Sequence, residues 1–110
     1  MTPTREQLEL AAKAAGKKLA YEMYAPTWGF GKNGIKLHDG SWWHPVTSKT
    51  DSFDLMVACK MYVDTASNTI AFAAAGKTQV SAYLKDHNND KELATMWAVF
   101  LCAVEIGRAM

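Results

Sequence analysis

Two histidines and an aspartate lie close together in one short stretch of the sequence. His38 and Asp39 are adjacent, and His44 follows them. Imidazole and carboxylate groups are ligands of zinc, and a mononuclear site needs several of them to converge. If Asp39 and Gly40 form a two-residue hairpin turn, His38 pairs with Ser41 and His44 lies further along the returning strand. Because this spacing does not force convergence, we predict structural or surface histidines and no metal site.

A glycine-rich run, Gly29-Phe30-Gly31-Lys32-Asn33-Gly34, matches the G-x-G-x-x-G pattern of dinucleotide-binding proteins. In those proteins the glycines follow a strand and lead into a helix whose N-terminus holds the pyrophosphate. Here they lead into Ile35–Leu37, which has the composition of a strand. Asn33-Gly34 is also a strong hairpin signal. We therefore predict a glycine-rich hairpin tip, in the kind of exposed position where binding sites are common.

The sequence contains two cysteines, Cys59 and Cys102, each within an apolar stretch of helical period. Apolar surroundings raise the pKa of a thiol and lower its reactivity. The spacing is not that of a C-x-x-C motif. We predict reduced, buried thiols, with a disulfide or a redox role as the alternative.

Other catalytic signatures are also missing from the sequence. It has no G-x-S-x-G, no H-E-x-x-H and no P-loop. Paired carboxylates occur at expected helix starts, where they interact favourably with the helix dipole. These pairs are Asp51 with Asp54 and Asp90 with Glu92. We predict a protein that is not an enzyme, with no catalytic residue and no cofactor.

Aromatic and basic residues crowd the region around the glycines. Aromatic rings with nearby cations stack on bases or nucleotides, and they also anchor protein interfaces. Trp42 and Trp43 are adjacent, so on a regular strand they point to opposite faces and one of them is left exposed. A core role, a protein interface and nucleotide stacking all stay open for these residues. The partner-binding residues that we select are Trp28, Phe30, Lys32, Lys36 and Trp42.

Composition limits the class of protein. The chain has 110 residues, 49% hydrophobic and 21% charged, with a formal net charge of +1, which fits a single domain over residues 1–110. The apolar fraction excludes intrinsic disorder, and the small charge disfavours binding of nucleic acid through bulk charge. The longest apolar run, Met96–Val104, is far shorter than the roughly 20 residues of a membrane span. Met1–Gly16 is too polar for a secretory segment, so we expect a cytoplasmic protein.

Hydrophobic periodicity and turn signals predict helices and strands in a regular order. Thr4 and Gln7 have capping-box spacing at the start of the first helix, and Asn89 with Glu92 has a similar spacing before the last. A polar connector, Asp86–Asp90, precedes the last helix, and we expect His87 in this connector to be solvated. The expected helices are Arg5–Ala15, Ser52–Met61 and Asp90–Arg108, and the expected strands are Lys18–Tyr24, Ile35–His38, Ser41–His44, Tyr62–Thr65, Thr69–Ala74 and Gln79–Leu84.

This order of elements predicts an α+β fold, with an antiparallel sheet of about five strands packed by three helices. Gln79–Leu84 has a polar face and is expected at a sheet edge. The last helix carries two apolar stripes, so both of its sides must be covered. Either it is sandwiched within the domain, or the second stripe contacts a second subunit. For a homodimer, the self-association residues that we predict are Met96, Val99 and Ile106.

Three blocks of the chain resemble small bacteriophage proteins grouped as the phage "ABA sandwich" domain. The blocks are the opening Thr4-Arg5-Glu6-Gln7-Leu8-Glu9-Leu10-Ala11-Ala12-Lys13-Ala14-Ala15-Gly16, the segment Trp43-His44-Pro45-Val46-Thr47 with Asp51 and Asp54-Leu55, and the ending Ala103-Val104-Glu105-Ile106-Gly107-Arg108-Ala109-Met110. His44 stands where the group has Asn, and Thr27–Lys36 and Met61–Leu84 have no counterpart. The resemblance implies helices flanking a sheet and supplies no catalytic residue.

With this resemblance, the sequence favours a phage accessory protein that acts by binding. We expect it to inhibit a host protein or an anti-phage defence protein in the host cytoplasm, for instance a CRISPR-type effector. Two alternatives from other classes stay open. One is a sponge for a nucleotide or other small ligand, with pockets built between subunits. The other is a structural component of phage assembly that self-associates through the last helix.

Overall fold

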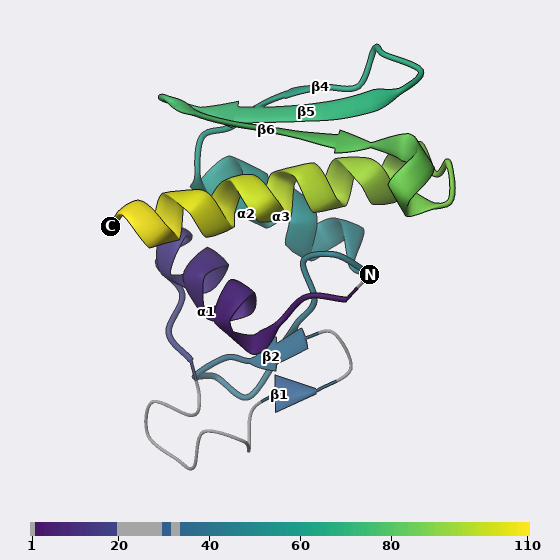
Figure 1. Cartoon of the computed structure of the whole chain (residues 1–110). Helices are drawn as coiled ribbons and strands as arrows, with labels where there is room; N and C mark the ends of the chain where they lie inside the picture. Colours follow the sequence, from purple (N-terminus) through teal and green to yellow (C-terminus); the bar gives the residue numbers. More distant parts are fainter. Residues whose placement is uncertain (1, 20–29, 32–33) are drawn as a thin grey trace.

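The computed structural model describes residues 2–19, 30–31 and 34–110, and the elements follow the expected order of helix, strands, helix, strands, helix (Figure 1). Most of the expected strand Lys18–Tyr24 lies outside the described residues, although Leu19 forms an isolated antiparallel bridge to Leu37. The elements are α1 (Arg5–Ala14), β1 (Phe30–Gly31), β2 (Gly34–Lys36), β3 (Trp42–Trp43), α2 (Lys49–Ala58), β4 (Tyr62–Asp64), β5 (Ile70–Ala75), β6 (Thr78–Tyr83), the 3₁₀ helix η2 (Leu84–His87) and α3 (Lys91–Ala109).

The capping box predicted for the first helix is confirmed. The Thr4 hydroxyl accepts a hydrogen bond from the Gln7 backbone N–H at 3.1 Å, and the Gln7 side chain accepts one from the Thr4 N–H at 3.0 Å. Two backbone donors at the start of α1 are thereby satisfied. Gly16 follows the helix with φ of +72°, a conformation that glycine adopts without strain.

The second helix begins earlier than its apolar period indicated. Ser48 caps α2 by accepting a hydrogen bond from the Asp51 N–H at 3.2 Å, so the helix runs from Lys49 to Ala58. The polar residues 49–51 form its first turn, where caps and acidic side chains are favoured. At the third helix the cap is Asp90, one residue after the expected Asn89.

Among the described residues, the strands form two three-stranded antiparallel sheets instead of one. In the larger sheet the order is β4-β5-β6, which places β6 at an edge as predicted. Ala71 lies opposite Ala82, and Ala73 lies between Val63 and Val80. This row of small and branched side chains faces the helices, because side chains alternate between the two faces of a strand.

The smaller sheet has the order β1-β2-β3. Gly31 is paired with Gly34, so the glycine-rich run connects two strands, as predicted, and does not lead into a helix. Lys36 is paired with Trp42 and the Leu37 N–H donates to the Ser41 carbonyl at 2.8 Å. The turn between β2 and β3 is therefore the three residues 38–40, and the expected pairing of His38 with Ser41 was wrong.

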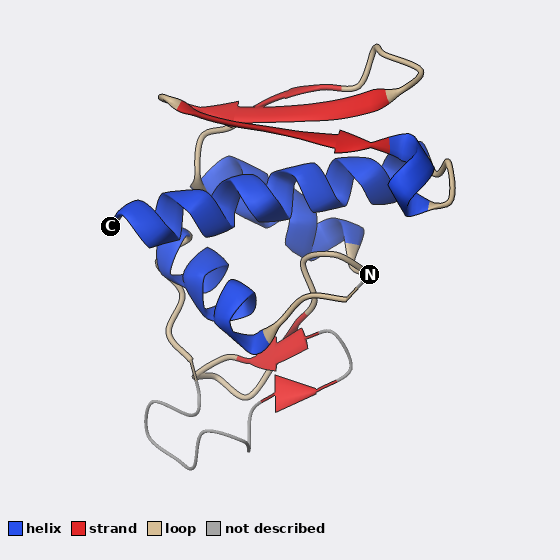
Figure 2. Ribbon diagram, viewed as in Figure 1, coloured by secondary structure: helices blue, strands red, loops and turns tan. Residues whose placement is uncertain are grey.

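The α+β class and the element order are confirmed, and the layers are arranged around α3. The β4-β5-β6 sheet covers one side of α3, α1 and α2 lie on its other sides, and the small β1-β2-β3 sheet lies beyond α1 (Figures 1 and 2). The helices thus occupy the middle of the domain, between two small sheets.

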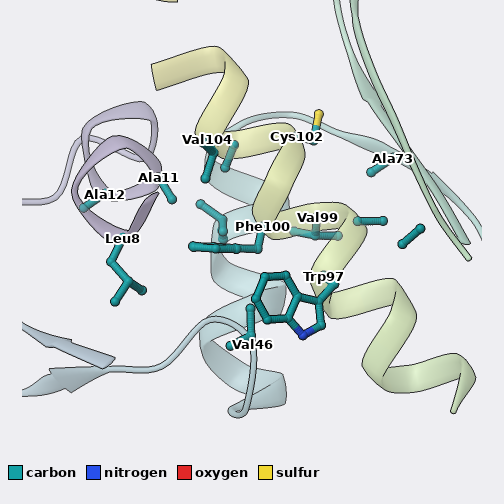
Figure 3. Packing of buried hydrophobic residues seen from close by; sticks show 14 of the residues in the cluster. Leu8, Ala11, Ala12, Val46, Ala73, Trp97, Val99, Phe100, Cys102 and Val104 are labelled. Atoms are coloured by element: carbon teal, nitrogen blue, oxygen red, sulfur yellow. The ribbon is translucent and has the colours of Figure 1, made fainter. Parts of the chain in front are cut away.

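Both apolar stripes of α3 are covered within the domain. Phe100 and Val104 point towards α1, whereas Cys102 points towards the large sheet (Figure 3). Of the predicted self-association residues, Val99 is also buried. Met96 and Ile106 are half-buried. Of the two interpretations of the last helix, the sandwiched one therefore accounts for most of its surface.

One glycine sets how closely α1 and α3 approach each other. A Cβ atom built on Gly107 would lie 2.0 Å from the Leu10 carbonyl oxygen and 2.7 Å from its carbonyl carbon. Both of these are backbone atoms, which cannot rotate away. Gly107 therefore lets the last turns of α3 lie directly on the backbone of α1, beside the buried Ala11.

The expectation that His87 is solvated was wrong. The connector after β6 folds into the 3₁₀ helix η2, and His87 is buried there. Its ring stacks on Trp97, with centroids 5.8 Å apart and an interplanar angle of 22°. Burial lowers the pKa of His87, and the Asp86 carboxylate opposes this effect. The neutral imidazole therefore serves as a packing group for α3.

Replacing Gly107 with Ala tests the close helix contact. At an ordinary helical position this change stabilises a helix by up to about 1 kcal/mol. Here we expect the opposite sign, a loss of about 1–3 kcal/mol or more, because the methyl group meets backbone. Urea denaturation measures the free energy of unfolding. Exposed Glu105 on the same helix is the control, and Glu105→Ala should change it by less than about 0.5 kcal/mol. A stabilised Gly107→Ala variant would contradict the contact.

The burial of His87 makes the stability of the fold depend on pH. In the unfolded chain His87 has its ordinary pKa of 6.5, whereas in the folded chain burial lowers the pKa of His87. The free energy of unfolding is therefore not reduced by His87 above about pH 6.5. Below that pH it falls by at most about 1.4 kcal/mol per pH unit, because the unfolded chain binds the proton more readily than the folded chain. Denaturation at pH 7.5 and at pH 5 should show a smaller decline in the free energy of unfolding for His87→Gln than for the wild type. Exposed His38→Gln is the control and should match the wild type.

Candidate functional site

The adjacent tryptophans of β3 have opposite environments, as the strand period predicted. Trp42 is 44% exposed, whereas Trp43 is 1% exposed. Strand β3 is an edge of the small sheet, and residues 44–48 connect it to α2, with Ser48 as the helix cap. A large aromatic side chain is therefore presented to solvent from a segment that is held at both ends, which suits an interface anchor.

The side chain of His44 supports the exposed tryptophan. The two rings stack with centroids 6.1 Å apart and an interplanar angle of 28°. His44 in turn lies against Gly34, where a Cβ atom would come within 2.4 Å of the imidazole. The backbone N–H of His44 donates to the Asp51 carboxylate at 2.8 Å. His44, which stacks on Trp42, is therefore in contact with both β2 and α2.

Trp43 belongs to the core. Its ring packs in the same buried cluster as Ile35 and Val46, and the ammonium of Lys17 lies 5.9 Å from its centroid. Within the described part of the chain, Trp43 Nε1 is buried without a hydrogen-bond partner. We therefore assign Trp43 to stability and Trp42 to the surface.

The structure brings together some of the predicted partner-binding residues. Lys36 is the cross-strand partner of Trp42, so the two share one face of the sheet, and Lys36 is half-buried. The backbone of Phe30 is paired with that of Ile35. Trp28 and Lys32 lie outside the described residues. The supported part of this surface is therefore the pair Lys36 and Trp42 with the adjoining His44.

In the stretch that contains His38, Asp39 and His44, the side chain of Asp39 makes hydrogen bonds within the turn and the side chain of His44 packs on β3. The Asp39 carboxylate accepts hydrogen bonds from the Ser41 N–H at 3.0 Å and the Ser41 hydroxyl at 2.6 Å. These bonds lower the pKa of Asp39. His44 stacks on Trp42 instead of turning towards Asp39. Among residues 2–19, 30–31 and 34–110, no group of three His, Cys, Asp or Glu side chains could hold a metal ion.

Neither cysteine is in a disulfide. Cys102 is buried and Cys59 is half-buried. Burial raises the pKa of both thiols, and the nearby Cys59 adds to the effect on Cys102. A raised pKa leaves little thiolate at neutral pH, so neither side chain is activated as a nucleophile.

A second candidate site, which the sequence did not reveal, is a groove between α2 and α3. Its volume is about 350 Å³, and the short connection after β4 closes one side through Thr65. This volume lies within the range of small-molecule sites. The groove is lined by Lys49, Ser52, Phe53, Met56, Thr65, Lys91, Glu92, Thr95, Met96 and Val99.

Part of the exposed face of α2 lines this groove, through Phe53 and Met56, and Val57 lies on the same helix outside the groove. Phe53 is 60% exposed and Val57, one turn later, is 57% exposed. The helical spacing of Phe53, Met56 and Val57 is that of a core stripe, so it did not indicate the groove. In the structure the buried residues of α2 are Ser52 and Leu55. Large exposed apolar groups that adjoin a concavity are typical of binding surfaces.

Comparisons of the chain with protein-family models, with curated proteins and with solved structures find no match. In the described part of the chain, no helix is long and apolar enough to cross a membrane.

Alanine substitution separates the roles of the two tryptophans. Trp43→Ala removes a fully buried ring and should lower the free energy of unfolding by about 3–5 kcal/mol. Trp42→Ala removes a half-exposed ring at a sheet edge and should lower it by less than about 1 kcal/mol. Urea denaturation of both variants beside the wild type makes the comparison. Equal losses for the two variants would show that Trp42 is needed for folding and is not a free surface group.

Proposed function

We propose that this chain is a phage accessory protein without catalytic activity, which binds a host protein or an anti-phage defence protein and inhibits it by occluding a surface. The exposed Trp42 is the observation that supports the binding role. The phage setting and the class of target rest on the sequence resemblance of the three blocks. A CRISPR-type effector is one target of this class.

The geometry around Trp42 suits an interface anchor. Tryptophan is enriched among the few residues that carry most of the binding energy of an interface. A ring already stacked on His44 loses little side-chain freedom when a partner covers it. Lys36 on the same face adds a cation for an acidic or polar rim.

The test is affinity capture of the target from the lysate of a phage-susceptible host, followed by binding measurements with the purified target. We expect Trp42→Ala to weaken binding by roughly 30-fold, the effect of losing about 2 kcal/mol at an interface hot spot. Inhibition of the target in a reconstituted assay should weaken in parallel. Calorimetry with the purified pair gives both the affinity and the stoichiometry.

Tyr83 provides the matched control. It is 53% exposed, lies on β6 of the other sheet and is likewise aromatic. Tyr83→Ala should bind the target as the wild type does. Equal weakening by both substitutions, or capture that Trp42→Ala leaves unchanged, would remove the proposed interface. Capture of no protein above the background of a heat-denatured sample would contradict the binding role itself.

A further inference from the structure

The two edge strands of the large sheet differ in length and in charge. At one edge, β4 has three residues and carries the Asp64 carboxylate, and both shortness and charge keep a sheet edge from pairing with another strand. At the other edge, β6 has six residues, and Thr78–Tyr83 contains no charged residue and no proline. Its pairing with β5 is continuous, so no bulge interrupts this edge. One edge of the sheet is therefore protected, and the other is open to a further strand.

Every second residue of β6 directs its backbone N–H and C=O away from β5. The Leu84 N–H donates to the Thr69 carbonyl at 2.9 Å, directly beyond the end of the β5–β6 register. In an antiparallel pair, residues that bond to the neighbouring strand alternate with residues whose backbone groups point to the other side. Counting back from Leu84, this alternation turns the backbone groups of Gln79, Ser81 and Tyr83 to the open edge. Each of them offers one donor and one acceptor there.

The apolar row on the inner face of the sheet stops at β6. Val80 packs against the core cluster and lies opposite the buried Ala73 of β5. Val80 itself is half-buried, because β6 is the last strand of the described sheet. A further strand with a small or branched residue beside Val80 would bury this apolar surface and continue the row.

A second copy of β6 meets both requirements. In a two-fold dimer the same residues of both chains form the contact. An axis at Val80 places Val80 opposite its own copy and Gln79 opposite Ser81 of the second copy. Outward backbone groups then meet outward backbone groups, and the apolar row continues across the axis. The same axis keeps Lys77 and Lys85 apart, whereas an axis at Ser81 would place each opposite the other.

Charge distinguishes a second copy from the strand of another protein. A strand of another protein could also bond to the open edge. A strand that is reserved for another protein, however, needs a device against pairing with its own copy, such as a charged side chain. The chain has such a device on β4, in Asp64, and has none within Thr78–Tyr83.

We propose that the open edge of β6 is the interface of a homodimer, in which two copies of β6 pair antiparallel and join the two large sheets into one continuous sheet. The protected β4 strands then lie at its two ends, so association stops at two copies. Trp42 lies on the small sheet. The dimer is therefore separate from the Trp42 surface and does not rest on the proposed function.

Charge reversal at the edge tests the dimer, with analytical ultracentrifugation of the full chain over a range of concentrations. We expect a reversible dimer for the wild type. Gln79→Lys with Ser81→Lys places ammonium groups opposite each other across the axis and should weaken dimerisation about tenfold or more. Gln79→Glu with Ser81→Glu should do the same. An equimolar mixture of the two variants should sediment as a dimer at concentrations where each alone is a monomer, because opposite charges then face each other.

The control carries the same added charge at the other edge of the sheet. Ala66 and Asn68 are exposed in the connection between β4 and β5. Ala66→Lys with Asn68→Lys should change the dimerisation constant less than about twofold. Urea denaturation of each variant shows that its monomer is folded.

Hydrogen exchange of the wild type measures the same interface without a variant. The Ser81 amide points to the open edge, so its exchange should slow as the protein concentration rises and the dimer forms. The amide of exposed Thr65, in the connection after β4, should exchange at the same rate throughout. This measurement decides the proposal even if the charged variants fail to fold.

Four results would overturn the proposal. A wild type that stays monomeric at every concentration would remove the dimer. A dimer that the lysine pair leaves intact would place the interface on another surface. Folded lysine and glutamate variants that do not associate when mixed would contradict strand pairing. Protection of the Ser81 amide that appears only when the captured target is added would assign the open edge to a strand of that target. Loss of target capture by Trp42→Ala affects none of the measurements on the protein alone, so the two proposals fail separately.

Discussion

The structure depends on covering one helix that has almost no solvent side. The central turns of α3 are buried from Trp97 to Phe100 and again from Cys102 to Val104, so apolar surface points in nearly every direction around its axis. The large sheet, α1 and α2 must each supply a surface of matching shape. This requirement explains why small residues lie on the faces that pack together. Alanines line β5, and Ala11, Ala12 and Gly107 line the contact of α1 with α3. Small residues let the backbones approach closely enough to exclude water.

Local signals in the sequence were sufficient to predict the helices and strands. They were not sufficient to predict which of these elements pack against each other. The Thr4 capping box, the alternation of Trp42 with Trp43 and the edge position of β6 follow from short-range rules, and the structure agrees with them. The division of strands into two sheets depends on the helix against which each sheet packs, α3 for the large sheet and α1 for the small one, and periodicity carries no such information. His87 shows the same limit, because a polar connector gives no sign that Trp97 will provide a ring on which it stacks.

The candidate sites illustrate how composition and burial can mislead. Phe53, Met56 and Val57 have the spacing of a core stripe, yet two of the three are more than half exposed, since α2 turns only Ser52 and Leu55 inwards. Conversely, of the predicted self-association residues, Val99 is buried, whereas Met96 and Ile106 are half-buried. Strand geometry predicted that one of the two adjacent tryptophans is exposed, and packing of Trp43 into the core decides that it is Trp42.

The short segment from His44 to Ser52 contributes to both candidate surfaces. Its Asp51 carboxylate holds the backbone of His44, which supports Trp42, and its Ser48 cap fixes the turn from which Lys49 and Ser52 reach the groove. A change in this segment, such as loss of the Asp51 carboxylate, therefore acts on the support of Trp42 on one side and on the first turn of α2 on the other.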